Sequence, residues 1–379
     1  MDPLRVLALN AGSHSLKAKL FALDGQRALG RPAGVIRAAH RSLAGTEAER
    51  LGQLEAFVAS FEGDAVDLVA HRVVAASPPS LHLAAPLDEE HRQAIRAAAE
   101  IAPLHTALTL AALEASEKAL PDAAQFAVYD SYFQNTLPDY AAIYGVPFDW
   151  FCAGLRRIGY HGLSHQYALH RAAEVLGRAP VSLRMVSAHL GGGTSLASIA
   201  NAVCFDATLG FTPLDGMPMI VRHGAIDPGM MLYALNHGLA DIETLARIRN
   251  EAETAGGPGD IDELVRAMRC GDARATLALE SYCYSISRAV GSLVPSIRRI
   301  DVLAFSGGVG EHSPEVRARV CESLEFLGIG LDGQANEANA GEIGRRDAAT
   351  RTLIIHAEEE WMMACHAADV AERSALAFS

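Results

Sequence analysis

Residues 184–206, which read RMVSAHLGGGTSLASIANAVCFD, carry the clearest strand pattern in the chain. This stretch contains three apolar runs, separated first by the glycine turn Gly191-Gly192-Gly193-Thr194 and then by Asn201-Ala202. Apolar runs of about four to eight residues bounded by glycine or asparagine turns are typical of β-strands. The stretch therefore predicts three consecutive strands, at residues 184–190, 195–199 and 203–206.

The same pattern occurs near the N-terminus. An apolar run at residues 4–9 ends in the turn Asn10–Ser15, and a second run follows at residues 16–23. Asp24-Gly25 then predicts a hairpin turn before more extended chain. Two such units, about 180 residues apart, predict two related halves that each combine strands and helices.

A third junction begins with the apolar run 301–305 and continues with the glycine segment Gly307–Gly310. Ser313 and Pro314 suit the N-cap and the first turn of a helix. The junction therefore predicts a strand, a glycine loop and the start of a helix. Alanine-rich segments elsewhere favour helices, for example at residues 88–99 and 108–119.

The composition is that of a folded chain without a membrane span. The 379 residues are 50% hydrophobic, and 32 Lys+Arg against 45 Asp+Glu give a net charge of −13. This length predicts two domains, and the acidic balance argues against nucleic acid as the main partner. No apolar stretch reaches the length of about 18 residues that a membrane span needs, and the N-terminus lacks the pattern of a secretion signal. We therefore expect a soluble cytoplasmic protein.

The six cysteines are scattered and form no CxxC motif. Cysteines in such a pattern are usually small buried residues in a reducing compartment. We expect this of Cys152, Cys204, Cys270, Cys283, Cys321 and Cys365.

Glycine-rich turns at strand ends favour phosphate binding, because backbone N–H groups without a neighbouring Cβ can point at a phosphate. One such turn is weak support, since tight hairpins also use glycine for steric reasons. Three of them, each after an apolar run, are harder to dismiss. Their arrangement resembles the superfamily of acetate and sugar kinases, heat-shock chaperones and actin, in which two duplicated halves clasp a nucleotide.

The chain resembles the acetate kinase family in an ordered series of motifs from about residue 5 to residue 366. The motifs are Asn10–Lys17, His71–Val74, Ala102–His105, Tyr129–Ser131, Arg156–His165, His189–Gly191, Gly210–Gly216, Arg222, Asp227–Gly229 and Gly307–Glu311. The resemblance implies an α/β protein with two duplicated ribonuclease H-like domains, as in the actin-like ATPase fold, and an active-site cleft between them. The implied N-terminal domain is 1–131 with a returning C-terminal helix at 359–379, and the nucleotide-binding domain is 132–358.

Two arginines are candidates for binding anions. Arg72 lies inside the apolar run 68–75, where a guanidinium is costly unless it meets an anion or forms a structural ion pair. Arg222 lies in a predicted loop, where a solvated arginine is ordinary. By resemblance both are catalytic and hold the substrate carboxylate and the transferring phosphoryl group, a task that suits the two-pronged guanidinium.

The resemblance also assigns catalytic roles to His161 and Asp130. An isolated histidine is usually a surface or capping residue, but the family pattern makes His161 a donor to the phosphoryl oxygens. Asp130 follows the predicted strand 125–129, where it either caps a turn or helix, or orients the substrate or a metal-bound water.

The resemblance implies ATP as co-substrate and Mg²⁺ or Mn²⁺ as the metal. Magnesium prefers oxygen ligands, and the resemblance assigns Asn10 and Glu359 to it, with Glu358 and Glu360 left open because three glutamates are consecutive. It assigns nucleotide binding to residues of the glycine turns and of one loop: Lys17, His189, Gly191, Gly192, Gly193, Asp260, Ile261, Asp262, Gly307, Gly308, Val309, Gly310 and His312.

By resemblance the acyl group of the substrate lies in a small apolar pocket formed by Val74, Leu104, Tyr160 and Pro213, with Arg72 at its carboxylate. The family usually has phenylalanine at the position of Tyr160. Because one methylene changes binding by only about 1–3 kcal/mol, acetate and propionate are both expected to react.

Most departures from the family pattern lie among the nucleotide-binding motifs. Gly192 and His312 each stand where the family usually has asparagine, and Asp262 stands where it has an arginine near the base. Outside these motifs, Ala75-Ala76-Ser77 replaces His-Gly-Gly, and His223-Gly224-Ala225 replaces Ser-Gly-Asp. We expect the acyl phosphate chemistry to be retained and adenosine recognition to be altered.

These observations predict an acetate kinase-type phosphotransferase that reversibly transfers the γ-phosphoryl group of ATP directly to acetate, without a phosphoenzyme. The alternatives are another donor (pyrophosphate or a different nucleotide), a longer acyl substrate as in propionate or butyrate kinase, or a non-catalytic nucleotide-binding regulator. The retained arginines argue against the regulator, because a binding module does not need both. The resemblance also implies a homodimer.

Overall fold

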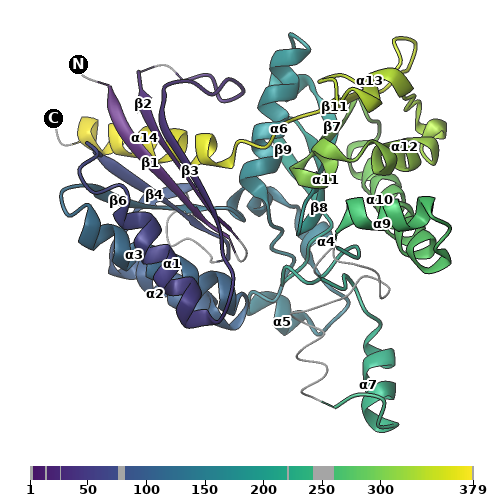
Figure 1. Ribbon diagram of the computed structural model, residues 1–379, viewed down its shortest axis with the longest axis horizontal. Coiled ribbons are helices and arrows are strands. Elements are labelled where there is room, and N and C mark those ends of the chain that lie inside the picture. Colours follow the sequence, from purple (N-terminus) through teal and green to yellow (C-terminus); the bar gives the residue numbers. More distant parts are fainter. Residues whose placement is uncertain are drawn as a thin grey trace. The chain divides into compact units, whose positions relative to one another are not determined.

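The computed structural model describes residues 3–12, 15–25, 27–75, 82–219, 222–241 and 260–377, except for the side chains of residues 103, 104 and 375–377. The chain forms two compact units (Figure 1). Unit 1 comprises Met1–Phe133, Tyr160–Tyr167 and Glu358–Ser379, and unit 2 comprises Gln134–Gly159 and Ala168–Ala357.

Unit 1 contains a six-stranded sheet in the order β3-β2-β1-β4-β6-β5. The first three strands form an antiparallel meander, and β4 and β6 continue the sheet in parallel from β1. The short β5 closes the other edge antiparallel to β6. The strands are β1 (Leu4–Ala11), β2 (Ser15–Leu23), β3 (Val35–Ser42), β4 (Leu68–Val73), β5 (Ala84–Pro86) and β6 (Ala124–Tyr129).

Helices cover both faces of this sheet. Because successive side chains of a strand point to opposite faces, Leu7 and Leu9 pack in one core with Leu54 of α1 (Glu47–Ala59) and Leu108 of α3 (Pro103–Ala119). The other face carries α14 (Glu359–Ala377), where Trp361 packs edge-on against a phenylalanine of β2. The remaining helices of this part are α2 (Glu89–Ala97), the 3₁₀ turn Ala98–Glu100 and the first residues of α6 (Gly162–Val175).

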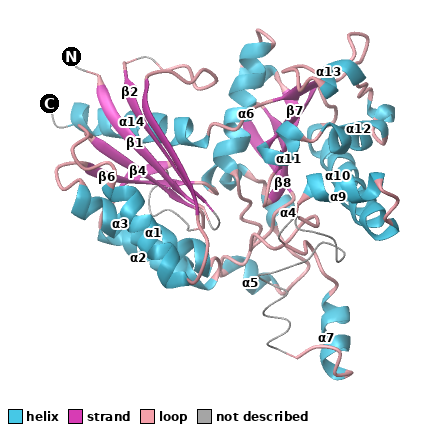
Figure 2. Ribbon diagram, in the orientation of Figure 1, coloured by secondary structure: helices cyan, strands magenta, loops and turns pink. Residues whose placement is uncertain are grey.

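Unit 2 contains a five-stranded sheet in the order β11-β10-β7-β8-β9, drawn in magenta in Figure 2. Here too an antiparallel meander of three strands continues in parallel through two later strands. This repeats the succession of β1, β2, β3, β4 and β6, so the expected pair of related α/β halves is confirmed. The strands are β7 (Arg184–Leu190), β8 (Thr194–Ala200), β9 (Val203–Ala207), β10 (Val302–Ser306) and β11 (Arg351–Ile354).

The core of unit 2 lies between this sheet and its longest helix, α10 (Ala273–Ile297), which buries Leu279, Ile286 and Val290. The other helices among the described residues of unit 2 are α4 (Asp139–Ala142), α5 (Phe148–Cys152), the rest of α6, α7 (Pro228–Asn236), α9 (Ile261–Arg269), α11 (Gly307–His312), α12 (Pro314–Glu322) and α13 (Gly333–Glu337). There are also 3₁₀ turns at Pro180–Ser182 and Glu325–Leu327, and another at Tyr132–Thr136 runs from the last residues of the first segment of unit 1 into unit 2.

Two local predictions need correction. The predicted glycine loop after β10 is a short helix, α11. Ser313 is the N-cap residue of α12 and Pro314 begins that helix, as expected, although the side chain of Ser313 makes no capping hydrogen bond. Asp24-Gly25 does not form a tight hairpin turn, because β2 ends at Leu23 and β3 begins only at Val35. In contrast, Asn201 and Ala202 form the predicted tight turn, with φ values of 53° and 62° that suit a type I′ hairpin.

All six cysteines are free thiols. Four are buried as expected, but Cys152 and Cys270 are exposed because each lies at the C-terminal end of a short helix, α5 or α9. Among the described residues, no helix has the length and apolar character needed to cross a membrane.

Candidate active site

The centre of the candidate site in unit 1 is a buried ion pair between Arg72 and Asp130. Arg72 lies on β4 and Asp130 directly follows the neighbouring parallel strand β6. The Nη2 of Arg72 lies 2.6 Å from the Oδ2 of Asp130, and the aspartate is completely buried. Burial by itself lowers the pKa of Arg72, but the carboxylates of Asp130 and Glu359 outweigh it and hold the pKa above its usual value. The guanidinium is therefore a permanent buried cation.

Asp130 also organises the turn that precedes α6. Its carboxylate accepts hydrogen bonds from the backbone N–H of His161 at 3.2 Å and of Leu163 at 3.1 Å. His161 has a φ of 55°, in the left-handed region that non-glycine residues seldom adopt. Asp130 thus fixes a strained turn as well as the guanidinium of Arg72, and it brings the backbone of His161 into the same cluster.

Asn10 connects this ion pair to the glutamates at the start of α14. Its Oδ1 accepts from the Nη1 of Arg72 at 3.2 Å. Its Nδ2 donates to Glu359 Oε2 at 2.8 Å and to Glu360 Oε1 at 2.9 Å. Residues that are widely separated in sequence therefore form one buried polar network.

The three consecutive glutamates have different surroundings. Glu358 forms an ion pair with Lys19 of β2. Glu359 and Glu360 both contact Asn10, and Glu360 also lies 3.9 Å from the ammonium of Lys19. Burial raises the pKa of Glu360, and the neighbouring carboxylate of Glu359 raises it further. Glu359 and Glu360 therefore share the contact with Asn10, whereas Glu358 is paired with Lys19.

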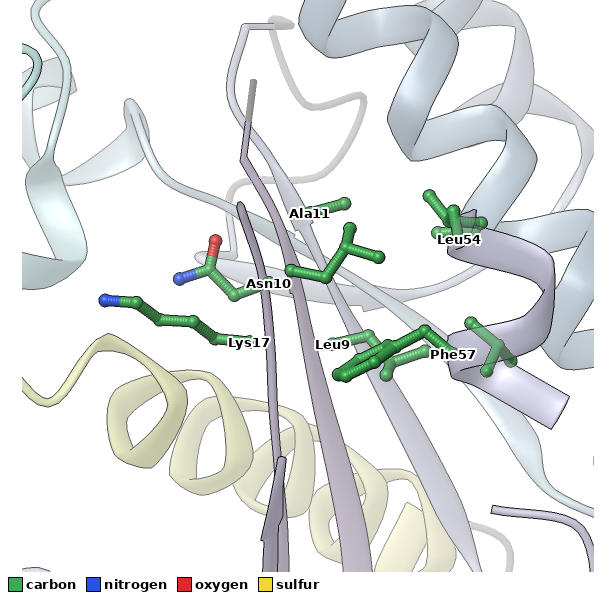
Figure 3. Close-up of a pocket in the computed structure, with 9 residues that line it drawn as sticks. Leu9, Asn10, Ala11, Lys17, Leu54 and Phe57 are labelled. Carbon is green, nitrogen blue, oxygen red and sulfur yellow. The ribbon is translucent and has the colours of Figure 1, made fainter. Parts of the chain in front are cut away.

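A pocket at the end of β1 adjoins this network (Figure 3). Leu9, Leu54 and Phe57 line it on the side of α1, whereas Asn10 and Lys17 project toward α14. Lys17 is exposed and lies opposite Asn10 in the register of β1 and β2. The apolar part of the pocket belongs to the core of unit 1, and its polar edge faces the glutamates.

The side chains at the start of α14 fit a magnesium ion. Among the residues that the structure describes, no group of three or more His, Cys, Asp or Glu side chains could hold a metal by itself. Magnesium does not need one, because it usually keeps several waters and takes one or two protein carboxylates beside substrate phosphates. Two adjacent carboxylates, Glu359 and Glu360, meet this requirement, and a divalent cation would favour their ionised forms.

Two glycine segments of unit 2 lie at the same end of its sheet. The turn Gly191–Gly193 follows β7, and Gly307–Gly310 follows β10, which pairs with β7 up to Ser306 and His189. Gly307 has a φ of 76°, and a Cβ there would lie 2.7 Å from the carbonyl oxygen of Leu190. Only glycine fits this close approach, so the proximity of the two segments depends on it.

Sequence reasoning missed two buried charges that hold the second glycine segment. The carboxylate of Glu311 accepts the N–H of Gly307 at 3.0 Å. The guanidinium of Arg317, which is completely buried, donates to the carbonyl oxygen of Gly310 at 2.9 Å and to both oxygens of Asn336. Burial lowers the pKa of Arg317 to about 10. The family motif included Glu311, but nothing in its spacing revealed which amide the carboxylate binds.

The other predicted nucleotide-binding residues differ in how far they are buried and in what they contact. Asp260 caps α9, since its side chain accepts the N–H of Asp262 at 2.7 Å. Ile261 is buried in the core of unit 2, whereas Asp262 and His312 are exposed. Ile261 therefore has a packing role that the sequence did not indicate.

The predicted acyl-binding residues are buried where the structure describes them. Val74 and Tyr160 belong to unit 1 and Pro213 to unit 2, while the side chain of Leu104 lies outside the described part. Arg222, also in unit 2, is half-buried, and its Nη1 donates to the carbonyl oxygen of Pro213 at 3.2 Å. This bond ties the second predicted arginine to a predicted pocket residue.

The duplicated sheets, the buried arginine–carboxylate network and the paired glycine segments define a phosphotransferase of the actin-like ATPase fold class. The Acetokinase family model matches residues 33–365. The chain belongs to the acetokinase family, which confirms the resemblance, the fold class and a phosphotransferase acting on a carboxyl group.

Individual relatives agree with this assignment. The acetate kinase of Nostoc punctiforme is 40% identical over 307 residues, which cover 79% of this chain and 76% of that protein. The crystal structure of Porphyromonas gingivalis acetate kinase is 30% identical with a TM-score of 0.82, and the match covers 97% of this chain and 100% of that one. A propionate kinase from Francisella tularensis is 25% identical with a TM-score of 0.83, covering 96% and 98%.

Proposed function

We propose that this chain transfers the γ-phosphoryl group of ATP reversibly and directly to the carboxylate of acetate, with magnesium. The observation that carries the proposal is the buried guanidinium of Arg72, held by Asp130 and Asn10. Its Nε is buried without a hydrogen-bond partner among the described residues. An unsatisfied buried donor is costly, and an anionic ligand would satisfy it.

The proposed mechanism depends on positioning and charge neutralisation, which supply most of the catalysis in phosphoryl transfer. Arg72 and Arg222 neutralise the equatorial oxygens of the group in transfer and orient the acceptor carboxylate. His161 donates a hydrogen bond to the same oxygens, and Asp130 holds both Arg72 and the backbone of His161 in place. Glu359, assisted by Asn10 and Glu360, would hold the magnesium ion, which supplies further positive charge when bound.

The two substrates are assigned to different groups of residues. Val74, Leu104, Tyr160 and Pro213 are assigned to the acyl group of the substrate. The proposed nucleotide site uses the two glycine segments, with Lys17, His189, the region Asp260–Asp262 and His312. The acid and the donor are thus expected to be selected by separate parts of the chain.

The proposed activity is tested by a matrix of donors and acids. Acetate, propionate and butyrate are each combined with ATP, GTP and pyrophosphate in the presence of magnesium, and acyl phosphate is trapped as the hydroxamate. We expect the most product from acetate with ATP, and less from propionate, because one methylene changes binding by about 1–3 kcal/mol. Absence of product in every combination would show that the chain is not a carboxylate kinase.

We also infer that the chain forms a homodimer through α7. This helix reads PGMMLYALN and has no buried residue, and Met230, Leu232 and Tyr233 are each more than half exposed. Figure 1 shows α7 apart from the sheet of unit 2. Exposed apolar patches of this kind mark protein interaction sites, and a second copy of the chain is the simplest partner because most soluble oligomers are homo-oligomers.

The double variant Leu232→Asp/Tyr233→Asp is expected to convert the dimer to a monomer, because it places two charges in an apolar interface. Light scattering coupled to size exclusion measures the mass. Leu277→Asp on α10 is the matched control, since Leu277 is also exposed, and it should stay dimeric. A wild-type monomer, or a double variant that remains dimeric, contradicts this assignment.

A further inference from the structure

The buried carboxylate of Glu311 connects the ends of two neighbouring strands. Its Oε1 accepts the backbone N–H of Gly307 at 3.0 Å and that of Ala357 at 3.1 Å, and its Oε2 binds the Nδ1 of His356. Gly307 directly follows β10, and Ala357 lies just after β11, which pairs with β10 in parallel. One side chain therefore fixes the backbone at both strand ends.

The charge of this carboxylate does not serve to attract a nucleotide. Burial by itself raises the pKa of Glu311, but hydrogen bonds from His356 and Ala357 outweigh it and lower the pKa below its usual value. The group is thus negative at neutral pH, and a negative charge repels a polyphosphate. Its effect on an anionic ligand must come from the backbone it holds, because a charged acceptor binds backbone amides more strongly than a neutral one does.

The amide that Glu311 binds begins the glycine segment. At Gly307 the chain turns with positive φ against the carbonyl of Leu190, so the start of the segment is closely confined. Because the N–H of Gly307 is already bonded to Glu311, this amide is not offered to a phosphate. The carboxylate instead determines where Gly308, Val309 and Gly310 lie.

The second amide lies in the chain that leads to the glutamates. Ala357 is joined by one peptide bond to Glu358, which begins the run of three glutamates. His356, the third partner, is largely exposed, with 74% of its side chain accessible. Of the three partners of Glu311, the two backbone amides are therefore on the buried side of the carboxylate, and His356 is on its solvent side.

We propose that Glu311 is a positioning residue for nucleotide binding, which fixes the backbone of Gly307–Gly310 and of Ala357 as one unit. The inference rests on the proposed function only in assigning nucleotide binding to the glycine segment. It deepens that function by naming a side chain that acts on the nucleotide through the backbone and does not itself contact the ligand.

The test compares three substitutions of Glu311 that separate the effect of side-chain length from the effect of charge. Glu311→Ala removes both backbone contacts, Glu311→Asp keeps the charge but shortens the side chain, and Glu311→Gln keeps an oxygen that reaches both amides. Glu322→Ala is the matched control, because Glu322 is exposed on the adjacent α12. The dissociation constant of ATP with magnesium is measured by calorimetry, and the KM values of ATP and acetate are measured separately.

We expect Glu311→Ala and Glu311→Asp to weaken ATP binding by about tenfold or more, as lost hydrogen bonds to a charged group should. Glu311→Gln should lie closer to the wild type, and the KM of acetate should stay nearly unchanged in all variants. ATP affinity equal to that of the wild type in Glu311→Ala overturns the proposal. A parallel rise in the KM values of ATP and acetate also overturns it, since this marks a general loss of structure.

Three further outcomes are decisive. If Glu311→Ala does not fold, the comparison of Glu311→Asp with Glu311→Gln decides: weaker binding by the aspartate supports the proposal, and equal binding overturns it. A wild-type protein that binds ATP but forms no acetyl phosphate contradicts the proposed function. The ATP dissociation constants of the Glu311 variants still test the role of Glu311 in that case. A wild-type protein that does not bind ATP overturns both.

Discussion

Arg72→Ala is expected to lower kcat by about three orders of magnitude or more, the range seen when an arginine that stabilises a transferring phosphoryl group is removed. The physical reason is the arrangement around its guanidinium. Asp130 and Asn10 hold it rigidly, and its Nε has no partner among the described residues. A cation fixed before the substrate binds stabilises developing negative charge without reorganisation.

A structural ion pair is the competing explanation for Arg72, and the chain offers a matched control. Arg27 is also an almost buried arginine of unit 1, and its Nε likewise has no hydrogen-bond partner among the described residues, but its Nη2 lies 2.6 Å from Asp369 and 2.8 Å from Glu372. Arg27→Ala should lower thermal stability with little effect on kcat. Hydroxamate formation and the unfolding temperature are measured on the same preparations. Near-wild-type turnover in Arg72→Ala would remove it from the catalytic group.

Asp130→Asn extends this test. Removing one partner of a buried ion pair is strongly destabilising, by about 3–5 kcal/mol, so both single variants are expected to unfold at lower temperature. Asp130→Asn keeps the charge of Arg72 but loses the contact that fixes it, so kcat should fall less than in Arg72→Ala. Assays well below the unfolding temperatures therefore separate the loss of stability from the loss of catalysis.

Glu359→Gln is expected to lower activity by about a hundredfold or more, because a bound metal supplies several kcal/mol of charge stabilisation in such reactions. It should also raise the magnesium concentration needed for half-maximal activity. The substitution preserves the shape of the side chain and an oxygen near Asn10, so the packing at the start of α14 is retained.

Glu358→Gln is the matched control for the metal assignment. Glu358 is the preceding residue, but its carboxylate is paired with Lys19. Its substitution should change the magnesium titration only slightly. If Glu358→Gln requires more magnesium than Glu359→Gln, Glu358 holds the metal and the assignment of Glu359 as the metal ligand is wrong.

The sequence was sufficient for the family and for most of the strands, but it did not predict β5 and β11. Strand positions are local properties, because the apolar runs and turn residues that define β7 and β8 are adjacent in the chain. The duplication was visible for the same reason, as the pattern simply occurs twice. Two local predictions were wrong: the glycine segment after β10 forms the helix α11, and the connection between β2 and β3 is longer than a tight turn.

The contacts between distant side chains could not be predicted from the sequence. Asn10, Arg72, Asp130 and Glu359 come together because the strand order places β1, β4 and β6 side by side and α14 returns to the same sheet. The sequence does not distinguish the three consecutive glutamates 358–360. In the structure, Glu358 contacts Lys19, whereas Glu359 and Glu360 contact Asn10. Likewise, the sequence does not reveal the partners of Glu311. The parallel pairing of β10 and β11 brings the amides of Gly307 and Ala357 to its carboxylate. The sequence determined the residue types and their order, and the fold determined the contacts, because contacts between distant residues depend on strand pairing and helix return rather than on neighbouring letters.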